Sequence, residues 1–195
     1  MTILTETPGL KIELKRKAFH SLALLYALGY AVLDRTVILR VLSAILLAVT
    51  VLEIARLLFP ALNRRFVSLF GGIHRPEEFN RFSGIFWTLA GTLLTMFLFR
   101  DPRVVYCAMG YLVFGDAAAA LAGVRFGRIK MGKNKTVEGC SAFFWTCLAV
   151  GFFFLTPEQA AAGALFAALV EVLPLPFNDN FWLPLLSGLF LTLLR

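Results

Sequence analysis

Seven apolar segments, separated by short polar connections, constrain this chain more than any other feature of its sequence. They cover residues 18–33, 36–59, 83–99, 104–124, 139–155, 157–173 and 181–194, and several are shorter than the roughly 20 residues usual for a membrane span. In lipid a segment must satisfy its own backbone polar groups, which favours helices. Of the 195 residues, 59% are hydrophobic and 16% are charged, whereas a soluble domain has roughly 25% charged residues. We therefore expect an all-α, polytopic membrane helix bundle of about seven transmembrane helices, forming a single integral-membrane domain over residues 1–195.

The distribution of Lys and Arg predicts the orientation of these spans. If the N-terminus is inside, the inner connections hold 14 of the 19 basic side chains. Because cytoplasmic loops carry the excess of positive charge, we expect a cytoplasmic N-terminal segment (1–17), a cytoplasmic loop at 125–138 and an external C-terminus. This distribution also explains the net charge of +7 without a nucleic-acid partner. The first 17 residues lead into an apolar segment without a cleavage site, so no signal peptide is expected.

The most informative stretch is residues 111–139, and its first half is an apolar segment that carries one acid, Asp116. On a helix, Gly115, Ala119, Gly123 and Gly127 recur every four residues and share a face. Small residues at this spacing let helix backbones approach closely in lipid. Because Asp116 is adjacent to that stripe, we expect its side chain to point into protein. An ionisable residue inside a membrane segment is a functional-site hypothesis by default.

The second half of the stretch is a loop rich in cations and glycine. Its five basic residues are Arg125, Arg128, Lys130, Lys133 and Lys135. Such a loop supplies phosphate-binding donors, and an acid beside it can hold Mg²⁺, which together suit phosphoryl or nucleotidyl transfer. Gly127 to Lys133 also fits the G-x-x-x-x-G-K spacing of a P-loop. We reject that reading because Asn134 replaces Ser or Thr and a hydrophobic helix precedes the loop.

Two further acids lie in apolar segments, Glu53 and Glu171. Together with Asp116 they occupy the inner halves of three segments that run in the same direction. If those helices are neighbours, the three carboxylates could cluster around Mg²⁺ at the inner surface, beside Lys133 and Lys135. For Glu53 the sequence leaves a second interpretation open, because Arg56 follows one helical turn later and would form an ion pair with it.

The polar flanks of the first spans offer membrane-surface contacts. Residues 60–82 include an amphipathic stretch that we expect to lie in the interface as a short helix. Arg16, Lys17 and His20 precede the first span, and Arg16 and His20 share one helical face. These residues are either a topology anchor or part of a site that receives a lipid headgroup, together with Glu53.

Two motifs resemble a known enzyme family. They are Gly115-Asp116-x-x-Ala119-x-x-x-Gly123-x-x-x-Gly127 and Gly132-Lys133-x-Lys135-Thr136-x-Glu138-Gly139. They look like the signature of the CTP-dependent lipid kinases, a group that includes dolichol kinase, phytol and farnesol kinases and yeast-type diacylglycerol kinase. Phosphatidate cytidylyltransferases carry a related pattern. Arg16-Lys17-x-x-His20 and Glu171 followed by Asp179-Asn180 and Pro184 resemble the kinase branch.

The resemblance implies a membrane kinase that transfers the γ-phosphate of CTP to a lipid alcohol, with Mg²⁺ as cofactor. As catalytic residues it suggests Asp116, Lys133, Lys135 and His20. The implied nucleotide-binding residues are Gly115, Gly132, Lys133, Lys135, Thr136, Glu138, Gly139, Asp179 and Asn180. The implied metal ligands are Asp116, Glu138 and Glu171, and the implied headgroup contacts are Arg16, Lys17, His20 and Glu53.

Several alternatives stay open at the level of sequence. A phosphatidate cytidylyltransferase would use the same nucleotide and metal, and a non-enzymatic transporter would use the membrane acids to relay ions. The acceptor lipid is a polyprenol, a phytol-like alcohol or diacylglycerol. We expect a multi-pass protein of a bacterial inner membrane, with its active site on the cytoplasmic side, membrane lipids as partners, and a homodimer as one option for its oligomeric state.

Overall fold

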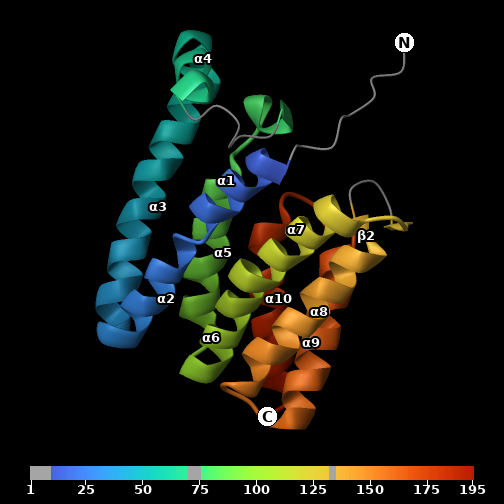
Figure 1. Ribbon diagram of the computed structural model, residues 1–195. Coiled ribbons are helices and arrows are strands. Elements are labelled where there is room, and N and C mark those ends of the chain that lie inside the picture. Colours follow the sequence, from blue (N-terminus) through green and yellow to red (C-terminus); the bar gives the residue numbers. More distant parts are fainter. Residues whose placement is uncertain (1–9, 70–75, 132–134) are drawn as a thin grey trace.

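The computed structural model describes residues 10–69, 76–131 and 135–195, and nearly all of them are helical (Figure 1). The α-helices are α1 (Leu10–His20), α2 (Ala23–Val32), α3 (Arg35–Leu58), α4 (Pro60–Leu69), α5 (Gly84–Leu98), α6 (Pro102–Gly110), α7 (Asp116–Phe126), α8 (Val137–Phe152), α9 (Pro157–Val172) and α10 (Asp179–Leu193). A 3₁₀ turn, η1 (Pro76–Asn80), and a π turn, η2 (Tyr111–Gly115), complete them. Two short antiparallel strands, β1 (Lys130–Met131) and β2 (Lys135–Thr136), pair Lys130 with Thr136. The all-α prediction is confirmed.

Each predicted apolar segment corresponds to a helix or to consecutive helices. The first segment is divided, because α1 ends at His20 and α2 begins at Ala23. The fourth segment is continuous from Pro102 to Phe126 and includes the π turn. The last helix, α10, begins at Asp179, before the predicted start of the segment at residue 181, and it contains Pro184. The Asn178 side chain caps α10, accepting a hydrogen bond from the Asn180 amide at 3.0 Å.

Helices α5 to α10 pack together as one bundle, and α2 and α3 lie along one side of it (Figure 1). In the bundle α8 lies between α7 and α9, while α10 contacts α5, α6 and α9. Helix α3 packs against α5 and carries α4 at its end. Helix α9 starts with a capping box, in which Thr156 and Gln159 each accept a hydrogen bond from the other's backbone amide.

The small-residue stripe on α7 brings its backbone against α8, as predicted. A Cβ atom at Gly115 would lie 2.7 Å from Cys147 Sγ. One at Gly139 would lie 2.8 Å from the Ala119 carbonyl oxygen. No side chain larger than hydrogen fits at either place without moving a helix. Gly115 and Gly139, which the family resemblance implies are nucleotide-binding, therefore serve helix packing in this structure.

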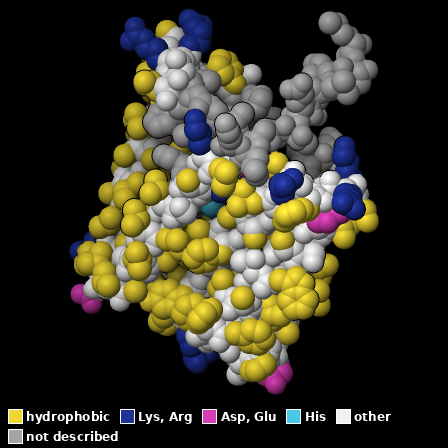
Figure 2. Space-filling view, viewed as in Figure 1, with side chains coloured by type: hydrophobic (Ala, Val, Ile, Leu, Met, Phe, Trp, Pro, Cys, Tyr) yellow, Lys and Arg dark blue, Asp and Glu magenta, His cyan; other side chains and the backbone are white. Residues whose placement is uncertain are grey.

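Apolar side chains cover most of the face shown in Figure 2, and Lys and Arg gather mainly toward the end that carries α4. Among the described residues, α3 and the continuous helix from Pro102 to Phe126 are long and apolar enough to cross a membrane, and α5 and α8 are shorter apolar helices. The exposed side chains of α3 are largely aliphatic, including Leu47, Val51 and Leu58. This surface suits a lipid environment; the count of seven spans and their orientation stay predictions.

The connection between α3 and α5 is held by a buried arginine, Arg56, which is 1% exposed. Arg56 donates to Glu53 Oε2 at 2.6 Å and to the carbonyl oxygens of Glu78 and Arg81 at 3.1 and 2.5 Å. Glu53 also accepts the Ser83 amide at 2.9 Å. The ion-pair interpretation of Glu53 is thus confirmed. The expected amphipathic helix corresponds to α4, and its place at a membrane interface stays a prediction.

Candidate active site

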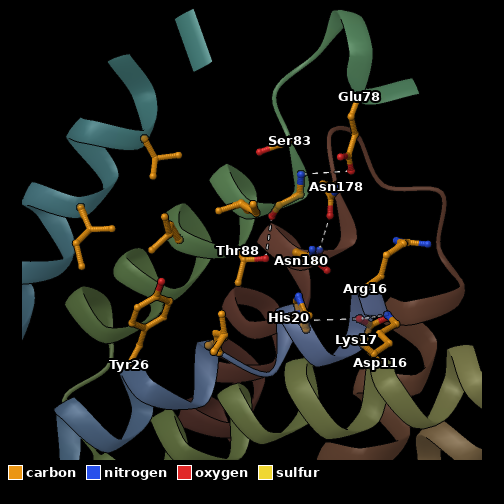
Figure 3. Close-up of a pocket in the computed structure, with 17 residues that line it drawn as sticks. Arg16, Lys17, His20, Tyr26, Glu78, Ser83, Thr88, Asp116, Asn178 and Asn180 are labelled. Carbon is orange, nitrogen blue, oxygen red and sulfur yellow. Dashed lines mark hydrogen bonds and ion pairs between the residues drawn. The ribbon is translucent and has the colours of Figure 1, made fainter. Parts of the chain in front are cut away.

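A pocket of about 210 Å³ opens between α1, α2, α3 and α5, and it has a polar end and an apolar end (Figure 3). The polar lining residues are Arg16, Lys17, His20, Glu78, Ser83, Thr88, Asp116, Asn178 and Asn180. The apolar ones come mainly from α2, α3 and α5 and include Ala23, Ile45, Val49 and Leu89. A cavity of this kind fits a molecule with a polar head and a hydrocarbon tail.

Asp116 lies at the polar end, as the first residue of α7. The π turn that precedes it, Tyr111–Gly115, is a rare backbone form that is frequently found at functional sites. The carboxylate forms an ion pair with Lys17, and His20 Nε2 lies 3.9 Å from Asp116 Oδ2. The Asp116 side chain is 16% exposed, so it points into protein as predicted. The structure thus places Asp116 beside two of the expected headgroup contacts, Lys17 and His20.

His20 has an imidazole nitrogen without a partner. Its Nε2 atom is shielded from solvent and makes no hydrogen bond to the described residues. Because buried polar atoms almost always have a hydrogen-bond partner, an orphan atom in a pocket wall indicates a group that the site is built to receive. Arg16 lines the same pocket from the same helix and forms an ion pair with Glu13 at 2.6 Å.

A second charged cluster joins the loop before α8 to the ends of α9 and α10. Lys135 in β2 forms an ion pair with Glu171, and its Nζ lies 2.9 Å from Asp179 Oδ2. Burial by itself would lower the pKa of Lys135, but the two carboxylates outweigh it, so the pKa lies above its ordinary value. Glu171 is 4% exposed, and its Oε2 has no hydrogen-bond partner among the described residues. The structure therefore brings together three predicted site residues from distant parts of the chain.

The two clusters are electrostatically connected. The charge of Asp116 interacts with the charges of Lys135 and Glu171, although no hydrogen bond joins Asp116 to either residue. Asp116 thus lines the pocket and also interacts electrostatically with the lysine cluster. This is the arrangement needed where an acceptor molecule meets a phosphate donor.

Thr136 and Glu138 hold the loop in place. Thr136 caps α8, and its side chain accepts the Gly139 amide at 3.1 Å. Glu138 accepts the amides of Arg128 and Ile129 at 3.0 and 3.3 Å, and hydrogen bonds from its own, Arg128 and Ile129 backbone amides lower its pKa. Both therefore act on loop shape in this structure. Gly132 and Lys133, named by sequence as nucleotide contacts, lie outside the described residues.

The predicted three-acid metal cluster is not formed. Within residues 10–69, 76–131 and 135–195, no group of three or more His, Cys, Asp or Glu side chains is placed to hold a metal ion. Glu53 is engaged by Arg56 and Ser83, and Glu138 is engaged by the loop backbone. Asp116 and Glu171 are paired instead with lysine side chains, Lys17 and Lys135, which can also bind phosphate. Since Mg²⁺ at phosphate sites is commonly bound by one or two carboxylates and by the phosphates themselves, this pair fits a nucleotide-borne ion.

Four pocket residues were not identified from sequence: Glu78, Ser83, Thr88 and Asn178. The Oε1 atom of Glu78 accepts the Gly84 amide at 3.3 Å, and its side chain lines the pocket. Ser83 caps α5, and Thr88 donates to the Gly84 carbonyl oxygen at 2.8 Å. Nothing in the spacing of these residues indicated the pocket, because η1, α5 and the turn before α10 meet only in three dimensions.

Taken together, fold and site define an all-helical protein that has two helices long and apolar enough to cross a membrane among its described residues, and a half-apolar pocket that adjoins an acid and lysine cluster. Comparison with known proteins gives a more particular result. CTP-dependent diacylglycerol kinase 1 of Saccharomyces cerevisiae is 27% identical to this chain, in an alignment covering 93% of the chain and 73% of that protein. The protein of the same name from Eremothecium gossypii is also 27% identical, over 93% of the chain and 67% of its own length.

An uncharacterised protein of Rickettsia prowazekii is 28% identical over 92% of this chain and 93% of its own length. No family model and no solved structure matches the chain. The similarity to the two yeast-type enzymes extends over nearly the whole chain and supports its assignment to the CTP-dependent lipid kinase family.

Proposed function

We propose that this protein is a membrane kinase that transfers the γ-phosphate of CTP to the hydroxyl group of a lipid alcohol at the cytoplasmic surface of the membrane. The observation that carries the proposal is the position of Asp116, which borders a pocket with an apolar end and also interacts with the Lys135 cluster. The relatives named CTP-dependent diacylglycerol kinase supply the choice of CTP. The acceptor class is a polyprenol, a phytol-like alcohol or diacylglycerol.

Phosphate transfer requires an attack by the lipid oxygen, a proton acceptor and stabilisation of phosphate charge. The lipid oxygen attacks the γ-phosphorus, the bond from that phosphorus to the β,γ-bridging oxygen breaks, and CDP leaves. His20 Nε2 lacks a partner in the pocket wall and is the group best placed to accept the hydroxyl proton. Asp116 stabilises the imidazolium that forms, from 3.9 Å. Lys135, together with Lys133 from outside the described residues, stabilises the phosphate charge that develops during transfer.

Mg²⁺, bound by Asp116 and Glu171 together with nucleotide phosphates, would supply charge neutralisation at the transferred group. Lys135 forms an ion pair with Glu171 Oε1, while Glu171 Oε2 has no partner among the described residues. When CTP binds, its phosphates compete with Glu171 and Asp179 for the Lys135 ammonium. This exchange releases carboxylate oxygens at the moment when a nucleotide-borne cation arrives.

The experiment that tests this function uses purified full-length protein in detergent with Mg²⁺ and a mixed pool of lipid alcohols plus phosphatidate. In parallel reactions CTP carries its label in the γ or the α position. The proposal predicts γ label in the lipid product and CDP as the second product. Incorporation of α label alone, with release of pyrophosphate, would identify a cytidylyltransferase instead. Absence of transfer from either position would contradict both enzyme functions.

A further inference from the structure

The start of α10 carries three consecutive polar residues, its cap Asn178 and its first two residues, Asp179 and Asn180. These residues face two different sites. Asp179 faces the lysine cluster, with its Oδ2 2.9 Å from Lys135 Nζ. Its two neighbours, Asn178 and Asn180, line the pocket instead. Figure 3 shows both asparagines beside the start of α5. A single turn therefore forms part of the boundary between the pocket and the cluster.

Three polar groups converge over the first residue of α5, Gly84. A Cβ atom at this position would lie 3.4 Å from Asn180 Nδ2, 3.4 Å from Glu78 Oε1 and 3.9 Å from Asn178 Nδ2. Because Gly84 has no side chain, the space between these groups belongs to the pocket. The pocket thus has a dense polar corner on the wall formed by η1, α5 and α10, apart from Asp116 and Lys17.

Much of the hydrogen-bonding capacity of this corner is free for a ligand. Glu78 Oε1 accepts the Gly84 amide, and Asn178 Oδ1 accepts the Asn180 amide. Within the described part of the chain, the Nδ2 groups of Asn178 and Asn180 and Glu78 Oε2 make no hydrogen bond. The corner therefore offers two amide donors and one carboxylate acceptor.

We infer that Glu78, Asn178 and Asn180 form the subsite that positions the headgroup of the acceptor lipid, and that only Asp179 of this turn serves the nucleotide. This inference rests on the proposed kinase function and moves Asn180 from the nucleotide-binding set to the acceptor set. Glu78, which accepts the Gly84 amide, holds the corner in shape, and the two amides donate to headgroup oxygens next to the hydroxyl that reaches His20.

The donor set selects a chemical class of acceptor. Two amide donors fit a glycerolipid, because ester carbonyl oxygens flank its free hydroxyl. A simple isoprenoid alcohol has no such carbonyls and would leave both amides unpaired, which costs binding free energy. The hydrocarbon chains of the glycerolipid lie along the apolar wall, beside Ala23, Ile45 and Val49.

Steady-state kinetics with the lipid and CTP varied separately test the residue assignment. For Asn180→Leu we expect the KM for diacylglycerol to rise about tenfold, the value of one lost hydrogen bond, with the KM for CTP unchanged. Asp179→Asn is the matched variant: because it removes a carboxylate that competes with CTP for Lys135, it should alter the KM for CTP and leave the KM for the lipid unchanged. If Asn180→Leu raised the KM for CTP and left the KM for diacylglycerol unchanged, the assignment would be overturned.

Gly84→Ala provides a second variant that retains all three polar groups. The added methyl group would sit at 3.4 Å from its nearest neighbours, an ordinary contact, so the helix can keep its place. Because the methyl group fills the corner, we expect the lipid KM to rise with the KM for CTP unchanged. An unchanged lipid KM in this variant would show that no headgroup enters the corner.

The acceptor class is tested with a diacylglycerol and the dialkylglycerol of equal chain length, which lacks the ester carbonyls. The wild-type protein should prefer the diacyl form by about tenfold in kcat/KM, and Asn180→Leu should reduce that preference. Equal use of both lipids, or transfer to an isoprenoid alcohol only, would contradict the inference and leave the kinase function intact. Absence of transfer to every alcohol would instead contradict the proposed function.

Discussion

At the scale of single residues, Asp116 is the residue on which the proposed phosphate transfer depends most. Asp116→Asn retains the side-chain shape and removes the charge that acts on His20 and, in the proposal, on the bound cation. Lys17 then keeps a partner in Glu13, at 4.0 Å. We therefore predict a turnover about 100 to 1,000 times lower with nearly unchanged thermal stability. Transfer of γ label and thermal unfolding in detergent measure the two quantities.

The matched control is Glu158→Gln, which removes an acid from an exposed position in the first turn of α9. Glu158 lies at the other end of α9 from Glu171, so this change should leave turnover at the wild-type level. Wild-type turnover in Asp116→Asn as well would contradict the assignment of the active site.

Single residues of the site differ in whether their roles could be predicted from sequence. Asp116 could be found because an acid in an apolar segment costs free energy and needs a reason. Glu78 and Asn178 could not, because a polar residue in a polar connection is unremarkable until the fold places it in a pocket. Glu53 had two interpretations from sequence, and only the geometry of Arg56 and Ser83 distinguished them.

At the scale of elements, the contact between α7 and α8 carries a prediction about stability. A side chain at Gly139 would collide with the Ala119 carbonyl oxygen, since its Cβ would lie at 2.8 Å from a backbone atom. Gly139→Val should therefore force the helices apart and lower stability by about 1–3 kcal/mol. Gly123→Ala is the milder comparison, because its Cβ would meet Thr136 Oγ1 at 3.3 Å. Equal stability of both variants, measured by thermal unfolding, would contradict this packing.

The ion pair between α3 and the α5 connection gives a second prediction at this scale. Arg56→Met leaves the buried Glu53 carboxylate with only the Ser83 amide, and removal of one partner of a buried pair costs about 3–5 kcal/mol. The double variant Glu53→Gln/Arg56→Met removes both charges and should recover part of that loss. Denaturant unfolding in detergent checks both variants. If the double variant were as unstable as the sum of its single changes, the pair would not be coupled.

Most of the elements could be predicted because apolar length and caps act locally. The Thr156 box and the small-residue stripe of α7 both follow from short-range spacing and are present in the structure. The break after His20 and the position of Pro184 inside α10 were missed. They depend on how α1 meets α7 and on how α10 meets α5, which are tertiary contacts.

At the scale of the whole molecule, the expected orientation of the bundle in a membrane carries the last prediction. We predict that the end with α1 and the β1–β2 loop faces the cytoplasm and that the loop before α9 faces outward. In a variant without the three native cysteines, Lys15→Cys should be protected from an impermeant thiol reagent in intact cells. Glu158→Cys should react with the reagent under the same conditions. The reverse pattern would place the proposed CTP site on the wrong side of the membrane.

The most direct test of the central claim is an experimental structure of the full-length protein with a β,γ-methylene analogue of CTP, Mg²⁺ and a diacylglycerol. We predict phosphate density beside Lys135, with the γ-phosphate between Lys135 and Asp116. We also predict the lipid hydroxyl at the polar end of the pocket, close to His20 Nε2. Nucleotide density away from Lys135, or lipid density outside this pocket, would contradict the claim that the two clusters form one active site.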